Sequence, residues 1–179
     1  MEQQNGARVA QREMIGWTVR RLLATDAAAY YALRLEGFTL HPLQFRVAPE
    51  DEHSQSLLEI GQKLEGTFVL GGFDAHDLIG IAGLTRFEGA KLRHRALLWG
   101  MYVSERARGS GLADELMKTL LAEARALEIR QVILTVAAEN ERAQRFYNRW
   151  GFAVYGTEPG AIRVAESYLD EVLMICLLE

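Results

Sequence analysis

The sequence predicts an α/β (α+β) fold, a mixed β-sheet with helices on both faces. Three observations predict it. An apolar run over 96–103 leads through the glycine-containing turn 106–111 directly into a helix. Apolar residues at helical spacing mark that helix over 112–127. The run Val-Ile-Leu-Thr-Val over 132–136 is continuously apolar and β-branched, which is typical of a central strand buried on both faces.

The N-terminal elements begin with a strand over 17–22, where apolar and polar residues alternate. Thr25 or Asp26 is suited to cap a helix that runs to about Glu36. Gly37 then predicts the end of this helix.

A second helix is expected over about 52–64, with Gly66 closing it. Strands over 67–73 and 78–87 form a predicted hairpin around the turn 74–77. The strand over 96–103 follows this hairpin after a basic connection.

The C-terminal part begins with a short helix that Asn140 caps and Gly151 ends. Two further strands are expected over 152–156 and 169–178. The polar segment 157–168 between them is expected to be a loop.

Composition limits the classes of function. The chain has 179 residues, 49% of them hydrophobic, and a net charge of -4. We expect one domain over 17–179 after a flexible N-terminal tail, residues 1–16. The acidic balance argues against general nucleic-acid binding. No apolar stretch approaches the roughly 20 residues that span a bilayer, so no membrane partner is expected. Because the N-terminal segment lacks a signal-peptide core, a cytoplasmic location is expected.

The sequence contains no residue pattern typical of a disulfide bond or a metal site. Cys176 is the single cysteine and lies in an apolar run, as a buried residue would. The four histidines show no metal-ligand spacing. We therefore expect no metal site.

The turn after the strand 96–103 predicts an anion-binding site. A helix N-terminus offers free backbone N–H groups and a partial positive charge, and Gly109 and Gly111 allow a close approach of the backbone. Arg106 and Arg108 add positive charge. The expected ligand is a phosphorylated small molecule. The alternatives are a tight turn without a ligand and a solvated pair of arginines.

The same turn, Arg106-Ala107-Arg108-Gly109-Ser110-Gly111, has the form Gln/Arg-x-x-Gly-x-Gly/Ala. It resembles the acetyl-CoA pyrophosphate loop of the GNAT superfamily of N-acetyltransferases. The segment 140–152 is similar to the family's Asn-x-x-Ala-x-x-x-Tyr-x-x-x-Gly-Phe signature. The resemblance is close from about Thr67 to Gly156 and weaker elsewhere.

The resemblance implies a mostly antiparallel sheet in which the strands ending at Val103 and Val136 are parallel neighbours that splay apart. Acetyl-CoA, as co-substrate, would lie in the opening, with its pantetheine arm on the backbone of Met101 and Val103 and its pyrophosphate on the glycine turn. The implied cofactor-binding residues are Met101, Val103, Arg106, Arg108, Gly109, Ser110, Gly111 and Asn140. Three arginines at helical spacing form either a basic stripe near the outer end of the cofactor or an exposed helix face: Arg142, Arg145 and Arg149.

The implied reaction is direct attack of a primary amine on the thioester through a tetrahedral intermediate. Tyr147 matches the tyrosine that protonates the departing thiolate; packing beside Phe146 and Trp150 is its alternative role. A backbone N–H near Met101 is the expected oxyanion donor. The general base is left open among Glu36, His41, His94 and Glu171. A non-catalytic acetyl-CoA sensor is the main alternative function, and transfer of a longer acyl group or to a hydroxyl also stays open.

The acceptor, a small-molecule amine or a peptide or protein amine, is expected between the first two helices and the segment 157–168. Five aromatic residues could line its pocket or could pack in the core: Tyr30, Tyr31, Phe38, Trp99 and Tyr168. Four acidic residues either attract a cationic amine or form a solvated face: Glu50, Asp51, Glu52 and Glu59. The apolar last strand, 172–178, belongs either to a homodimer interface or to the interior of the monomer.

Overall fold

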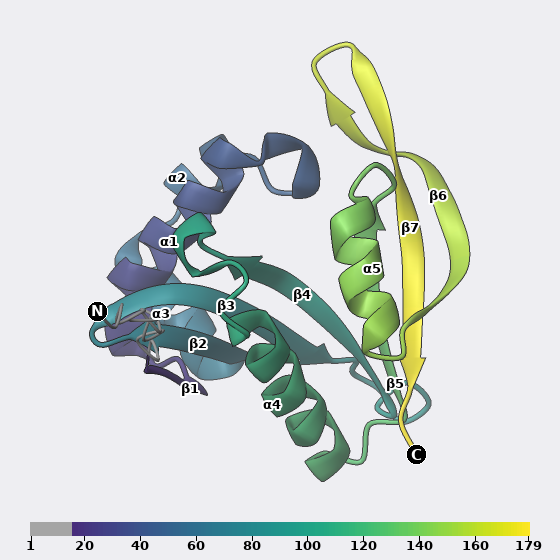
Figure 1. Ribbon diagram of the computed structural model, residues 1–179, viewed down its shortest axis with the longest axis horizontal. Helices are drawn as coiled ribbons and strands as arrows, with labels where there is room; N and C mark the ends of the chain where they lie inside the picture. Colours follow the sequence, from purple (N-terminus) through teal and green to yellow (C-terminus); the bar gives the residue numbers. More distant parts are fainter. Residues whose placement is uncertain (1–15) are drawn as a thin grey trace, which may run out of the picture.

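The computed structural model describes residues 16–179, in which a seven-stranded sheet has the order β1-β2-β3-β4-β5-β7-β6 (Figure 1). All neighbouring strands are antiparallel except β4 and β5, which are parallel. The strands are β1 (Trp17–Arg21), β2 (Phe68–Asp74), β3 (Asp77–Arg86), β4 (Arg95–Val103), β5 (Gln131–Ala137), β6 (Ala153–Val164) and β7 (Ser167–Leu177). The predicted mixed sheet is therefore confirmed. The predicted tail, residues 1–16, lies outside the described residues except for Gly16.

Helices cover both faces of the sheet, as predicted. The helices are α1 (Ala27–Leu40), α2 (Pro49–His53), α3 (Leu57–Gly66), α4 (Leu112–Ala126) and α5 (Glu141–Arg149), with single 3₁₀ turns η1 (Ala24–Asp26), η2 (Pro42–Gln44) and η3 (Glu105–Ala107). Successive residues of a strand face opposite sides, and β2 shows this plainly. Leu70 packs in the cluster formed with α4 and α5, whereas Val69 packs in the cluster formed with α1 and α3.

A pair of glycines brings α4 directly against the sheet. Gly72 of β2 pairs with Gly80 of β3. A Cβ atom at Gly72 would lie 2.5 Å from Leu112 Cδ1, and one at Gly80 would lie 3.0 Å from Leu112 Cδ2. Leu112, the first residue of α4, is completely buried there. The start of α4 is thus fixed by the absence of side chains on two neighbouring strands.

The parallel strands β4 and β5 pair only at their first residues. Their register covers Arg95 with Gln131, Ala96 with Val132 and Leu97 with Ile133. Beyond this point β4 continues along β3, while β5 continues along β7. The two strands therefore separate, as the resemblance implied, and an opening forms between them.

The first helix is longer than predicted. Gly37 does not end α1, which continues to Leu40. A Cβ atom at Gly37 would lie 3.3 Å from the ring of Tyr102 on β4, so this glycine allows close packing of helix and sheet. His41, with φ -135° and ψ 56°, is the residue that leaves the helical conformation.

The predicted single helix over 52–64 is wrong. Two helices, α2 and α3, occupy the region. The break has a local cause, because Ser56 and Glu59 form a capping box: Ser56 Oγ accepts from the Glu59 N–H, and the Glu59 carboxylate accepts from the Ser56 N–H. Gly66 is the last residue of α3, as expected.

The predicted loop 157–168 is also wrong. Residues 153–164 form β6, which pairs with β7 in a long hairpin that projects beyond the rest of the sheet (Figure 1). Most of β6 is exposed, so it lacks the apolar alternation of a half-buried strand. Because β7 pairs with β5 on one side and β6 on the other, its apolar run lies inside the monomer's sheet. Across residues 16–179, the helices are too short or too polar to cross a bilayer.

Candidate active site

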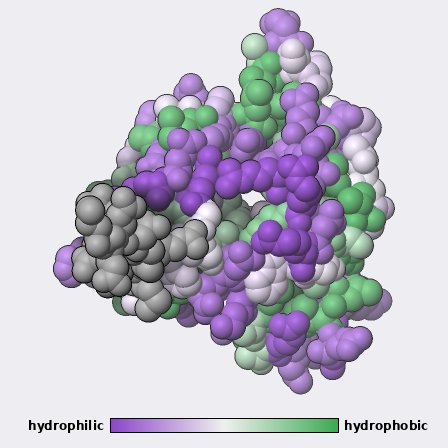
Figure 2. Space-filling model, viewed as in Figure 1, coloured by the Kyte–Doolittle hydropathy of each residue, from purple (hydrophilic) through white to green (hydrophobic). Residues whose placement is uncertain are grey.

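A cleft of about 960 Å³ opens where β4 and β5 separate. Its walls come from the end of β4, the turn before α4, the end of β5, helix α5 and the loop after α1. Figure 2 shows that this face is hollowed near its centre, with hydrophilic residues around the hollow. Of the residues predicted for the site, the lining contains Met101, Val103, Arg108, Gly109, Gly111, Asn140 and Tyr147, whereas Arg106 and Ser110 lie outside it.

The glycine turn forms one end of the cleft. Gly109 and Gly111 have φ values of 76° and 93°, a left-handed conformation that favours glycine. A Cβ atom at Gly109 would meet no atom within 4 Å, so its backbone borders open space. Gly111 is the N-cap of α4 and offers no capping side chain. The turn can therefore present backbone N–H groups to an anion at a helix N-terminus.

Ser110 has a structural place in this turn. Its hydroxyl donates to the carbonyl of Ala107 at 2.7 Å and accepts from the N–H of Leu112 at 3.3 Å. A contact of Ser110 with a ligand in the cleft would thus have to come from its backbone.

The two arginines of the turn lie in different places. Arg108 lines the cleft, where Nη1 donates to Glu105 Oε1 at 3.0 Å and Nη2 lies 2.6 Å from His41 Nε2. Arg106 lies outside the lining, and its Nη2 donates to Asp77 Oδ2 at 3.1 Å. Arg108 is therefore the arginine of this pair that can reach a ligand in the cleft.

The three arginines of α5 are among the residues that line the cleft: Arg142, Arg145 and Arg149. Arg145 is paired with Glu141 at 2.9 Å, and Arg149 is paired with Asp114 of α4 at 3.0 Å. Both arginines are more than half exposed. The two alternatives for these arginines, a basic stripe beside the cofactor site and an exposed helix face, therefore do not exclude each other, because the exposed face of α5 borders the cleft.

A β-bulge shapes the cleft wall on β4. Ile81 pairs with Tyr102 and Gly83 pairs with Trp99, so two residues of β4, Gly100 and Met101, oppose a single residue of β3. Gly100 has φ 63°, as glycine does in such bulges. The bulge takes backbone groups of Gly100 and Met101 out of the ladder at the place where an oxyanion donor is expected. A glycine inside an apolar strand pattern is the sequence signal that could have located it.

Tyr147 lies on the α5 side of the cleft and is 8% exposed. Its ring packs edge-on against Phe146 and Phe152, with centroid distances of 5.5 and 5.7 Å. Burial raises the pKa of the Tyr147 hydroxyl above its ordinary value, so the group stays protonated at neutral pH. Core packing and a position in the cleft thus coexist at this residue.

Asn140 caps α5, as predicted, because its Oδ1 accepts from the N–H of Ala143 at 3.1 Å. It also lines the cleft.

Of the four candidates for a general base, the structure brings His41 to the cleft lining. The carboxylate of Glu36 accepts from the hydroxyl of Tyr102 at 2.9 Å. His94 stands before the first residue of β4, at the paired end of the parallel strands, away from their splayed ends. Glu171 is 3% exposed and accepts from Arg46 Nε at 2.5 Å.

Among the aromatic residues expected around the acceptor, Trp99 lines the cleft, and its Nε1 donates to Thr85 at 2.7 Å. Tyr168 lines a smaller neighbouring hollow of about 360 Å³. Tyr30 and Phe38 are buried beneath the guanidinium of Arg34 instead. The loop after α1 supplies Gln44 and Phe45, which no periodic pattern in the sequence indicated.

The acidic residues near α2 are largely engaged in local structure. Glu52 is 1% exposed and forms a two-point ion pair with buried Arg34, at 2.6 and 3.0 Å. Asp51 accepts from the N–H of Ala48 at 3.2 Å, and Glu59 caps α3. Glu52 is therefore buried and paired and is not part of a free acidic face. Asp51 and Glu59 are exposed, and their part in attracting a cationic amine stays a prediction.

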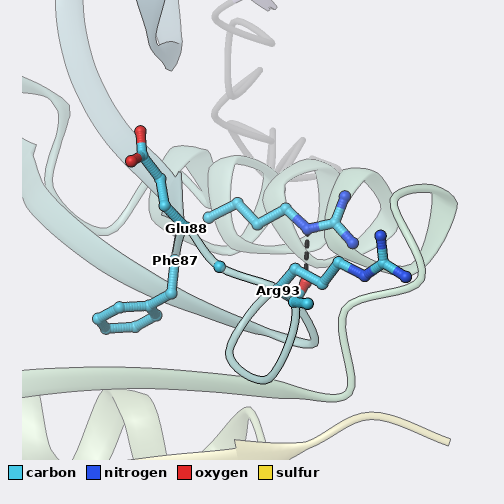
Figure 3. A pocket seen from close by; sticks show the side chains of 6 residues that line it. Phe87, Glu88 and Arg93 are labelled. Carbon is cyan, nitrogen blue, oxygen red and sulfur yellow. Dashed lines mark hydrogen bonds between the residues drawn. The ribbon is translucent and has the colours of Figure 1, made fainter.

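A separate hollow of about 440 Å³ lies in the connection between β3 and β4 (Figure 3). Phe87 and Glu88 extend to different sides of this connection, and Arg86 Nε donates to the carbonyl of Arg93. The lining shares no residue with the cleft. Within residues 16–179, His, Cys, Asp and Glu side chains form no group that could hold a metal ion.

Comparison with known families agrees with this architecture. Residues 27–152, more than half of the chain, match the model of the acetyltransferase (GNAT) family. The chain belongs to this family and is an acetyltransferase. No curated protein sequence matches it.

Solved structures of the family are similar over nearly the whole chain. A GNAT-family acetyltransferase from Streptococcus pneumoniae is 22% identical with a TM-score of 0.82, and the match covers 92% of this chain and 100% of that one. A ribosomal-protein-alanine N-acetyltransferase from Brucella melitensis is 25% identical with a TM-score of 0.74, covering 90% and 99%. A phosphinothricin acetyltransferase from Sinorhizobium meliloti, in complex with AcCoA, is 21% identical with a TM-score of 0.77, covering 90% and 88%.

Proposed function

We propose that this protein is an N-acetyltransferase that transfers the acetyl group of acetyl-CoA to a primary amine by direct attack. One observation carries the proposal: a single cleft joins the glycine turn 109–111 to Tyr147 between two strands that separate. The Sinorhizobium meliloti structure contains acetyl-CoA, and the Brucella melitensis protein is named for an alanine acceptor. Both support a thioester donor and an amine acceptor.

The cleft suits the donor along its length. The turn 109–111 and Arg108 would bind the diphosphate through backbone N–H groups and a guanidinium. Beyond Leu97, β4 has no strand partner on its β5 side, so the pantetheine arm can hydrogen-bond there as an added strand.

The chemistry falls to the residues around the bulge and α5. A backbone N–H at Gly100 or Met101 would stabilise the oxyanion of the tetrahedral intermediate. Tyr147 would protonate the departing thiolate. Direct attack is favoured because Cys176, the single cysteine, lies outside the cleft lining.

The wider context is also part of the proposal. We expect residues 17–179 to act as one domain in the cytoplasm, on a small-molecule or peptide amine, without a nucleic-acid or membrane partner. A homodimer would pair through surfaces other than the two edges of β7, which β5 and β6 occupy.

Calorimetry with acetyl-CoA, followed by a thiol-release assay over a panel of amines, tests the proposal. The panel comprises phosphinothricin, a peptide with an N-terminal alanine and a polyamine. We expect binding of acetyl-CoA and thiol release with at least one class of amine. Folded protein that does not bind acetyl-CoA would contradict the donor. Binding without release for every amine would favour the acetyl-CoA sensor instead.

A further inference from the structure

A contact in the cleft joins the anion-binding turn to the loop after α1. Arg108 Nη2 lies 2.6 Å from His41 Nε2, and Arg108 Nη1 donates to Glu105 Oε1 at 3.0 Å. A guanidinium has only donors, so His41 Nε2 must be the acceptor. The ring is then neutral and carries its proton on Nδ1. In this state the Nε2 lone pair is not available to another group.

The His41 backbone is fixed by its surroundings. Its N–H donates to the carbonyl of Gly37 at 2.9 Å, and its carbonyl accepts from the N–H of Gln44 at 3.0 Å. Its ring lies 6.1 Å from that of Tyr102, measured between centroids. Arg108 instead extends from the glycine turn, and 27% of its side chain is exposed. The Arg108 guanidinium stands at the end of a long, partly exposed side chain, so it can move while the backbone of both residues stays in place.

We propose that Arg108 is shared between His41 and the diphosphate of the cofactor, so that cofactor binding frees His41 to act as the general base. The proposal rests on the proposed function. Charge-assisted, two-point bonds from a guanidinium to phosphate oxygens are stronger than one bond to a neutral imidazole together with an ion pair to Glu105, whose side chain is 57% exposed. A bound diphosphate at the turn 109–111 therefore takes Arg108, and Nε2 of His41 loses its donor.

The freed nitrogen can accept one proton from the ammonium form of the acceptor. The N–H bond of the ammonium breaks, its electron pair becomes the lone pair that attacks the thioester, and the proton forms a new bond to His41 Nε2. Glu105 Oε1 lies 3.5 Å from Nε2 and can hold the resulting imidazolium. The charged and titratable groups facing His41 are Arg108, Glu105 and Tyr102, whose hydroxyl is bonded to Glu36.

Calorimetry with CoA, which carries no acetyl group, tests the competition for Arg108. In the His41→Ala variant the diphosphate no longer competes with the imidazole for Arg108. We therefore expect CoA to bind to this variant about three- to tenfold more tightly than to the wild type. Arg108→Ala should bind CoA more weakly, and adding His41→Ala to it should change nothing further. His76→Ala, an exposed histidine in the β2–β3 turn, is the matched control. Unchanged or weaker CoA binding by His41→Ala would overturn the proposal.

Nuclear magnetic resonance of the histidine ring nitrogens provides a second readout. The ¹⁵N resonance of His41 Nε2, assigned by its loss in His41→Ala, should shift when CoA binds. Free Arg108→Ala should already show the shifted resonance. If the resonance in Arg108→Ala coincides with that of the free wild type, the two residues are not coupled and the proposal fails.

The catalytic half of the proposal is tested with an amine from the acceptor panel. At saturating acetyl-CoA, His41→Ala should lose about 10²-fold in kcat at neutral pH, with a smaller loss near pH 10, where the amine is already neutral. An unchanged kcat would remove His41 as the base. The CoA and resonance experiments need no acceptor, so they decide the coupling even if every amine fails and the proposed function is wrong.

Discussion

At the residue scale, Tyr147 shows how one side chain serves the core and the cleft together. Its ring completes an aromatic group with Phe146 and Phe152, while the cleft borders the same residue. Burial disfavours the phenolate and raises the pKa of the hydroxyl. The hydroxyl therefore stays protonated at neutral pH, which the proposed donation of a proton to the departing thiolate requires.

Tyr147→Phe tests this role. The ring and its packing are kept while the proton is lost, so we expect acetyl-CoA binding within about twofold of the wild type and a fall in kcat of about 10²-fold or more. Calorimetry and thiol release measure the two quantities. Because its pKa is raised, Tyr147 should not cause a loss of wild-type rate below about pH 10. Full activity of Tyr147→Phe would assign the residue to packing alone.

The sequence predicted the features that depend on backbone conformation or local spacing, namely the glycine turn and the Asn140 cap. Gly109, Gly111 and Asn140 belong to these features, since a turn or a helix end specifies them within a few positions. The sequence could not show which of the two arginines of the turn lines the cleft. The side-chain partners of Arg106 and Arg108, which are Asp77 and His41, come from distant parts of the chain. Side-chain partners of this kind are set by tertiary packing.

At the element scale, an ion pair secures the connection from β1 into α1. Asp26 accepts from Arg20 Nη1 and Nη2 at 2.7 and 2.8 Å, and also from the N–H of Leu23 at 2.9 Å. The hydrogen bonds from Arg20 lower the pKa of Asp26. A carboxyl whose pKa is lower in the folded state stabilises the fold above its unfolded pKa, and this contribution is lost as the pH falls through the folded pKa.

Asp26→Asn should therefore cost stability in a pH-dependent way. We expect a loss of about 1 kcal/mol in the free energy of unfolding at pH 7, a modest value because Arg20 is half exposed to solvent. The difference from the wild type should shrink as the pH falls below about 4, where the carboxyl of the unfolded chain is protonated. Urea unfolding at pH 7 and pH 2.5 measures it, with exposed Glu50→Gln as the control. A difference independent of pH would show that ionisation of Asp26 contributes nothing.

Elements with strong periodicity were predictable, and elements held by tertiary contacts were not. The α4 helix and the β5 strand follow from their apolar patterns, and the apolar face of α4 is buried as predicted. The β5 strand is not buried on both faces, because its residues alternate between buried and partly exposed up to Val136. The separation of α2 from α3 depends on one capping box, and β6 is defined by pairing with β7 while most of its side chains face solvent. Neither the capping box nor an exposed strand produces a periodic pattern of apolar residues, so neither could be predicted from apolar spacing.

At the scale of the whole molecule, the loop between α1 and α2, which lines the cleft, extends toward the half of the sheet that contains β7 (Figure 1). Arg46 of this loop donates from Nε to Glu171 at 2.5 Å and from Nη2 to Glu158 at 3.0 Å. The Glu171 side chain is 4% exposed, so Arg46 neutralises an otherwise buried charge. This link adds to the joining of two halves of the sheet, whose strands pair with each other only at the start of β4 and β5 within the described residues.

Arg46→Ala should be destabilising for this reason. It leaves the Glu171 carboxylate buried without its cation, and we expect a loss of about 2 kcal/mol in the free energy of unfolding. Glu158→Gln, which removes the half-exposed partner, should cost less than about 0.5 kcal/mol. Urea unfolding compares the two variants, and equal stability of Arg46→Ala and the wild type would exclude the link.

The glycine pair that admits Leu112 has a consequence for how this protein can vary. Gly72 and Gly80 lie outside the cleft lining, yet a methyl group on Gly72 would push against the first residue of α4. Any outward movement of that helix carries the N–H groups of the turn 109–111 with it. The geometry of the anion-binding turn thus depends on Gly72 and Gly80, which lie on other strands. A variant at either glycine could lose ligand binding while it stays folded, so ligand binding and folding have to be measured separately.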